Sequence, residues 1–140
     1  MAIAVQGLSP LLYVFDIARS VHFYCDLLGF EVTAQGSYHG PGLLHWAELQ
    51  MNGKEVLLKS AYADGERPAQ PDPCRMAAHA DTVLMFCCPE VDAAYGHLVE
   101  AGMKVEPPTV ARYGLKELFV RDPDGYEICF QWPEKCDDSE

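Results

Sequence analysis

Apolar and polar positions recur in the same order in the two halves of the chain. Residues 11–32 read LLYVFDIARSVHFYCDLLGFEV and residues 85–105 read MFCCPEVDAAYGHLVEAGMKV. Each segment opens with a short apolar run, which indicates a strand, and continues with apolar residues at helical spacing. An acidic residue, Asp16 or Glu90, precedes each predicted helix, and Gly29 or Gly102 follows it as a C-cap. Strands are expected to resume at 30–32 and 103–105.

The remainder of each half predicts a hairpin. Strand-like runs at 45–50 and 54–60 are joined at Asn52-Gly53, which is a strong hairpin signal. Runs at 115–121 and 126–132 are joined by Asp-Pro-Asp-Gly at 122–125. The order βαβββ is therefore expected twice within one domain of residues 1–140. The modules cover about 8–60 and 81–132, with a Pro-, Gly- and Ala-rich linker at 61–80 and a polar tail at 133–140.

These motifs resemble a known family. The segments DIARSVHFYCDLLGFEV and EVDAAYGHLVEAGMKV, with YGLKELFVRDPDGYEICF, are similar to the vicinal oxygen chelate superfamily of glyoxalases, bleomycin resistance proteins and extradiol dioxygenases. The resemblance implies an α+β fold in which two tandem βαβββ modules form an incomplete barrel. Helices would cover its convex side, and the concave side would hold a ligand.

Strand alternation assigns side chains to faces, and a shift of one residue would invert the assignment. We expect Leu12 and Val14 to pack under the first helix, and both tryptophans to face the helices. The positions expected to face the cavity in the hairpins are His45, Ala47, Glu55, Leu57, Lys59, Glu117, Phe119, Glu127, Cys129 and Gln131.

Metal-dependent relatives hold a divalent ion with His and Glu at four strand positions. Spacing to Asp16, Glu90 and the two hairpin glycines maps these positions to Ser9, Leu57, Val83 and Cys129. Two aliphatic side chains, a hydroxyl and one thiol do not make the three or more ligands that such an ion needs. We therefore predict no metal and no cofactor, although a trio of His45, His79 and Glu117 stays open as an atypical site.

Composition narrows the possible partners. Ten Lys and Arg face 21 Asp and Glu, a formal net charge of −11, which disfavours nucleic acid and anionic membrane surfaces. The six cysteines show no disulfide framework, and the N-terminus shows no signal peptide, so a cytoplasmic protein with reduced thiols is expected. The resemblance implies a homodimer.

With the metal positions apolar or neutral, the chain is closest in character to the bleomycin-resistance branch, whose members sequester a drug without a metal. We therefore predict that it binds an organic, cationic or aromatic small molecule. Two alternatives remain: a metal-dependent lyase, isomerase or dioxygenase with an atypical ion site, and a binding domain that serves as a sensor or as the partner of another protein. The candidate ligand-binding residues are Tyr13, Phe15, His45, Leu57, Met85, Tyr113, Glu117, Phe119 and Cys129.

Overall fold

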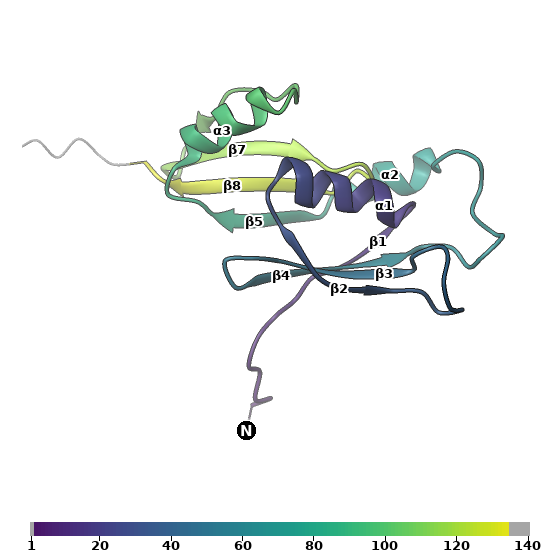
Figure 1. The fold of residues 1–140 in the computed structure, drawn as a ribbon. Coiled ribbons are helices and arrows are strands. Elements are labelled where there is room, and N and C mark those ends of the chain that lie inside the picture. Colours follow the sequence, from purple (N-terminus) through teal and green to yellow (C-terminus); the bar gives the residue numbers. More distant parts are fainter. Residues whose placement is uncertain (1, 135–140) are drawn as a thin grey trace, which may run out of the picture. The chain divides into compact units, whose positions relative to one another are not determined.

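The structure, a computed structural model, describes residues 2–134 (Figure 1). The chain divides into two compact units, and the boundary along the chain falls between Pro71 and Asp72. We call them the N-terminal and the C-terminal unit and describe each by itself. None of the helices in the described residues is long and apolar enough to cross a bilayer. The elements, in order, are β1 (Leu11–Val14), α1 (Ile17–Val21), a π-helical turn (His22–Leu27), β2 (Glu31–Gly36), β3 (Trp46–Met51), β4 (Lys54–Ser60), α2 (Pro73–His79), β5 (Val83–Cys87), α3 (Val91–Glu100), β6 (Thr109–Val110), β7 (Leu115–Arg121) and β8 (Glu127–Pro133).

The two units share one sheet topology, which confirms the tandem α+β repeat. The strand order is β1-β4-β3-β2 in the N-terminal unit and β5-β8-β7-β6 in the C-terminal unit. The first strand of each unit runs parallel to the last, and the other pairs are antiparallel. Neither sheet closes into a barrel by itself, because each ends in two edge strands that pair with a neighbour on one side only.

The first helix begins and ends where the sequence predicts. The Asp16 side chain accepts a hydrogen bond from the Ala18 N–H at 3.1 Å and so caps the first turn. Gly29 has a φ of +100°, which a residue with a Cβ rarely adopts, and it turns the chain from the helix toward β2. The helix contacts β3 and β4, and Phe23 and Tyr24 are buried.

The register of β4 is confirmed, whereas that of β3 is wrong by one residue. Asn52-Gly53 forms a two-residue turn, so Trp46 pairs with Lys59 and Ala47 pairs with Leu58. Directly paired residues share a face, and Leu58 is buried under the helix. Ala47 is therefore buried as well, and His45, which precedes β3, is also buried. Trp46 lies on the opposite, open face, where we had expected His45.

The C-terminal unit confirms the second hairpin but not the strand expected at 103–105. Leu118, Val120 and Ile128 are buried on the side of β7 and β8 that contacts α3. Residues 103–108 form no strand, and pairing resumes only at β6, after Pro107 and Pro108, which lack an N–H to donate to a neighbouring strand.

The region expected to be a linker contains a helix that packs on the C-terminal unit. Asp72 caps α2 through the Cys74 N–H at 2.9 Å, and Pro73 occupies the first turn, where its missing N–H costs nothing. His79 Nδ1 lies 2.7 Å from the Asp124 carbonyl oxygen, and its ring stacks on Tyr126 at 4.0 Å. The last nine residues of the expected linker, 72–80, are therefore part of the folded second unit.

Candidate functional site

Each sheet has one face that contacts the helices of its own unit and one face that does not. On the second, open face of the C-terminal unit, alternate residues of β5, β7 and β8 come together by strand pairing. Met85 pairs with Cys129, which also pairs with Phe119, and Met85 and Phe119 are 52% and 41% exposed. The partly exposed thioether and phenyl groups flank Cys129 on either side and form an apolar surface that suits an organic guest.

A buried carboxylate lies at one end of this open face. Glu117 pairs with Gln131 in the sheet and is only 7% exposed. The Tyr113 hydroxyl donates a hydrogen bond of 2.5 Å to Glu117 Oε2. Tyr113 can contact Glu117, four residues later in the chain, because Gly114, with a φ of +90°, closes a tight turn between Ala111 and Leu115. The turn therefore places an exposed phenol against a buried acid.

The carboxylate influences its neighbours. The hydrogen bond to Glu117, which is stronger when the phenol is protonated, raises the pKa of Tyr113 above its usual value. Burial, reinforced by the negative charges of Glu117 and Glu127, raises the pKa of the Cys129 thiol to about 11. Cys129 is therefore a neutral thiol at physiological pH and behaves as a small apolar side chain.

The open face of the N-terminal unit carries a shallow pocket of about 330 Å³. The Trp46 indole lies on Gly36, where a Cβ would come within 2.7 Å of the ring, so the absence of a side chain at Gly36 makes room for the indole. The Lys59 ammonium lies 5.8 Å from the ring centre of Tyr13, within range of a cation–π interaction. The pocket is lined by Leu11, Trp46, Ala47, Glu48, Glu55, Leu57, Leu58 and Lys59.

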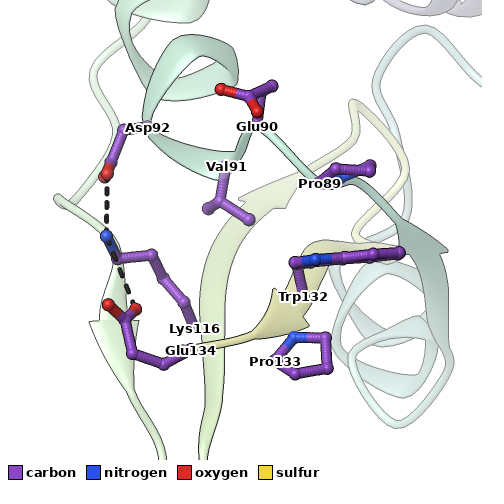
Figure 2. A pocket seen from close by; sticks show the side chains of 8 residues that line it. All are labelled: Pro89, Glu90, Val91, Asp92, Lys116, Trp132, Pro133 and Glu134. Atoms are coloured by element: carbon purple, nitrogen blue, oxygen red, sulfur yellow. Dashed lines mark hydrogen bonds and ion pairs between the residues drawn. The ribbon is translucent and has the colours of Figure 1, made fainter. Parts of the chain in front are cut away.

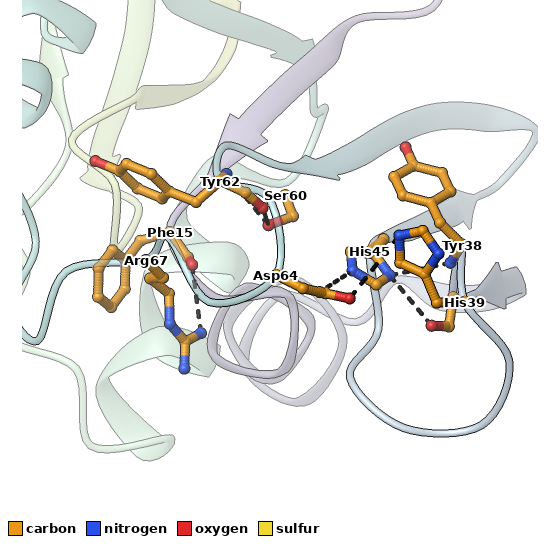
Figure 3. A network of polar contacts seen from close by, with 9 residues as sticks. Phe15, Tyr38, His39, His45, Ser60, Tyr62, Asp64 and Arg67 are labelled. Carbon is orange, nitrogen blue, oxygen red and sulfur yellow. Dashed lines mark hydrogen bonds and ion pairs between the residues drawn. The ribbon is translucent and has the colours of Figure 1, made fainter.

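His45 belongs to a separate polar cluster at the start of β3 (Figure 3). Its Nδ1 accepts the Tyr38 N–H at 3.0 Å, so the ring proton lies on Nε2, which donates to Asp64 Oδ1. The Tyr38 ring stacks on the imidazole at 4.7 Å. These contacts tie the loop before β3 to the segment after β4, and His45 is a buried structural residue in the N-terminal unit.

Phe15 is likewise engaged at the end of β1 rather than along the open face. The guanidinium groups of Arg19 and Arg67 lie 5.3 and 5.1 Å from the centre of its ring, and the ring meets Tyr62 edge to face. Arg67 also donates to the Phe15 carbonyl oxygen at 3.4 Å (Figure 3). The structure therefore groups Tyr13 with Leu57 on one open face and Met85, Glu117, Phe119 and Cys129 on the other, with Tyr113 at its edge.

Another pocket of about 330 Å³ lies on the C-terminal unit beside the start of α3 (Figure 2). Lys116 Nζ bonds Asp92 at 2.7 Å and lies 3.6 Å from a Glu134 carboxylate oxygen. The hydrogen bond to Asp92 raises the pKa of Lys116. The indole of Trp132 is 39% exposed in this pocket, on the helix-facing side that its register predicts.

The four positions that the resemblance assigns to metal ligands do not fit a divalent ion. The Ser9 hydroxyl donates to Glu55 Oε2 at 2.7 Å, Leu57 and Val83 are aliphatic, and Cys129 is a buried neutral thiol. Three or more His, Cys, Asp or Glu side chains with the spacing of a metal site do not occur within residues 2–134. Each member of the trio His45, His79 and Glu117 has its own partners: Asp64 and Tyr38, Asp124 and Tyr126, and Tyr113, respectively.

Comparison with known proteins identifies the family. The model of the Glyoxalase/Bleomycin resistance protein/Dioxygenase superfamily matches residues 7–130. The uncharacterized protein YaeR of Escherichia coli (strain K12) is 36% identical over 116 residues, covering 81% of this chain and 84% of YaeR. The bleomycin resistance protein of Geobacillus stearothermophilus is 31% identical over 129 residues, covering 86% and 92%.

Solved structures show the same fold at lower identity. TnmS3, an antibiotic binding protein from Streptomyces sp. CB03234, superposes with a TM-score of 0.69 at 20% identity, covering 95% of this chain and all of TnmS3. TioX from Micromonospora sp. ML1 gives 0.68 at 18% identity, covering 91% and 98%. These two likenesses show a shared fold.

Proposed function

Because the chain belongs to the Glyoxalase/Bleomycin resistance protein/Dioxygenase superfamily, we propose that it binds a small organic molecule on the open face of its C-terminal unit. The observation that carries the proposal is that one face holds two exposed apolar side chains, Met85 and Phe119, together with the buried carboxylate of Glu117. Apolar contact supplies affinity, and a polar group placed among apolar neighbours supplies orientation. The ligand class is therefore an aromatic or cationic organic molecule.

The proposed mechanism is sequestration, in which no bond is made or broken. The side chains at Ser9, Leu57, Val83 and Cys129 offer no ligand set for a Lewis-acid metal, and the thiol of Cys129 is protonated and buried. The relatives called bleomycin resistance proteins and the antibiotic binding protein with this fold agree with a binding role. The net charge of −11 favours the approach of a cationic guest.

A thermal-shift experiment tests the proposal. A molecule that binds only the native state raises the melting temperature in proportion to the logarithm of its concentration. We expect bleomycin or a small aromatic cation such as benzamidinium to raise the melting temperature of the wild type. Phe119→Ala should reduce the shift. The matched control, Val110→Ala, shortens an apolar residue of similar exposure whose strand position is on the other face, and it should leave the shift unchanged.

Elemental analysis separates this proposal from a metal-dependent lyase, isomerase or dioxygenase. A sequestering protein should retain the thermal shift after dialysis against EDTA. Stoichiometric Zn, Mn, Ni or Fe in the purified protein, with a shift that depends on it, would overturn the metal-free proposal.

We also propose that the binding protein works as a homodimer, as the family resemblance implies, and in the cytoplasm, where its cysteines would stay reduced. Static light scattering of the purified chain tests the assembly. We expect twice the mass of one chain, and a monomer at micromolar concentration would contradict the dimer.

A further inference from the structure

We infer that Tyr113 is a displaceable gate on Glu117. Its hydroxyl makes the hydrogen bond to the carboxylate that an N–H group of a cationic ligand takes over on binding. The inference rests on the proposed function and adds the chemistry of the ligand and the residue that competes with it.

Glu117 is a buried acid with no cationic partner among residues 2–134. A carboxylate that leaves water must be compensated by hydrogen bonds or an opposite charge. None of the Lys, Arg or His side chains in the described residues forms an ion pair with Glu117, and Tyr113 is its one side-chain hydrogen-bond donor there. The phenol engages Oε2 and leaves Oε1 without a donor among those residues. The acid therefore retains a capacity for hydrogen bonding that the unit itself does not use.

The Tyr113 side chain is far more exposed than the carboxylate to which it donates. The residue is 69% exposed, on the turn between β6 and β7, whereas Glu117 is 7% exposed within the sheet. Breaking the contact leaves the sheet intact, because β7 keeps its pairing with β6 and β8. The hydroxyl can therefore leave the carboxylate by a movement of the turn or a rotation of the side chain.

A cationic donor is a better partner for the carboxylate than the phenol. A phenol makes one strong hydrogen bond to a carboxylate, whereas an amidinium or guanidinium adds an opposite charge and can engage both carboxylate oxygens at once. A flat amidinium with an aromatic ring would also place that ring near Phe119, which is two residues along the same face of β7. The contact with Tyr113 lowers the apparent affinity for such a ligand, because only those protein molecules whose carboxylate is not occupied by the phenol can bind it.

Isothermal titration of the full chain with benzamidinium tests the gate, with neutral, nearly isosteric benzamide as the control ligand. Tyr113→Phe keeps the ring and removes the competing hydroxyl, so we expect benzamidinium to bind at least about threefold more tightly. The same variant should bind benzamide as the wild type does. Glu117→Gln should reduce benzamidinium affinity at least about tenfold in either background. Tyr38→Phe, which removes an exposed phenol in the N-terminal unit, is the matched control and should change neither ligand.

The outcomes distinguish the gate from the proposed function. If Tyr113→Phe binds benzamidinium as the wild type does, or more weakly, Tyr113 is not a competitor and the gate is wrong. Binding of bleomycin or benzamide to the wild type would then leave the proposed function standing. If no aromatic or cationic molecule binds the wild type, the proposed function fails and the gate fails with it.

A measurement without ligand checks the contact itself. In protein labelled with ¹³C-tyrosine, Glu117→Gln should lower the pKa of Tyr113, because the carboxylate no longer stabilises the protonated phenol. An unchanged Tyr113 titration would show that the two groups do not interact, and would also overturn the gate.

Discussion

Replacing Gly125 by alanine should destabilise the C-terminal unit through a specific collision with α2. Gly125 lies in the turn between β7 and β8 with a φ of +92°, and an added Cβ would lie 2.3 Å from the Met76 carbonyl oxygen. The carbonyl carbon of Met76 would be 3.0 Å away. Both contacts involve helix backbone, so a change of side-chain rotamer cannot relieve them.

The magnitude follows from three local contributions. Alanine in the left-handed conformation costs about 1 kcal/mol. A helix displacement of about 1 Å would weaken the hydrogen bond from His79 to the Asp124 carbonyl, worth about 1 kcal/mol. It would also disturb the stacking of His79 on Tyr126, worth about 1 kcal/mol. The expected loss is about 3 kcal/mol, or a fall in melting temperature on the order of 10 °C.

Urea unfolding monitored by circular dichroism measures the loss, and Gly102→Ala isolates its cause. Gly102 lies in the same unit with a φ of +89°, but an added Cβ there would meet nothing within 4 Å. It should therefore cost only the conformational strain of about 1 kcal/mol. If Gly125→Ala loses no more stability than Gly102→Ala, α2 does not pack on the turn as described and the reasoning is refuted.

Two other predictions concern buried groups. His45→Ala should cost about 2–4 kcal/mol in urea unfolding and speed proteolysis of the loop at 37–44, because Tyr38 and Asp64 lose their shared partner. His39→Ala, whose side chain is 72% exposed, should cost less than about 0.5 kcal/mol, and equal losses would contradict the structural role of His45. Cys129, with a pKa of about 11, should react with iodoacetamide at pH 8 at least about 100-fold more slowly than exposed Cys74. Equal labelling of both cysteines in the folded protein would contradict the burial of Cys129. Because burial raises the pKa of this thiol from 9.0, the free energy that it contributes to stability should be complete below pH 9 and lost as the pH rises toward 11.

Local patterns determined most of the fold, since the signals that carried it act over a few residues. Asp16 and Gly29 mark the ends of the first helix through capping and positive φ, which depend only on adjacent backbone. The repeat of strand, helix and hairpin could be compared between the halves, and the comparison located both modules. The faces of β1, β4, β7 and β8 followed from alternation against buried neighbours.

The sequence does contain a signal for the correct faces of β3. Across the two-residue turn at Asn52-Gly53, the residue numbers of each cross-strand pair add up to an odd number. Paired residues share a face, so a face that carries odd-numbered residues of β4 carries even-numbered residues of β3. That rule places Trp46 and Glu48, rather than His45 and Ala47, beside Leu57. The candidate site in the N-terminal unit thus gained an indole and lost an imidazole.

What the sequence alone determined is the pair of modules, their helix ends and four of the five strand faces considered above, because caps, turns and alternation are encoded between near neighbours. Only the tertiary structure decided that His45 is held by Asp64, that α2 packs on Gly125, and that Tyr113 hydrogen-bonds Glu117. The first two contacts join residues far apart along the chain, and the third depends on how a turn folds back over a strand. Such contacts follow from packing in three dimensions, and periodicity along the chain does not specify them.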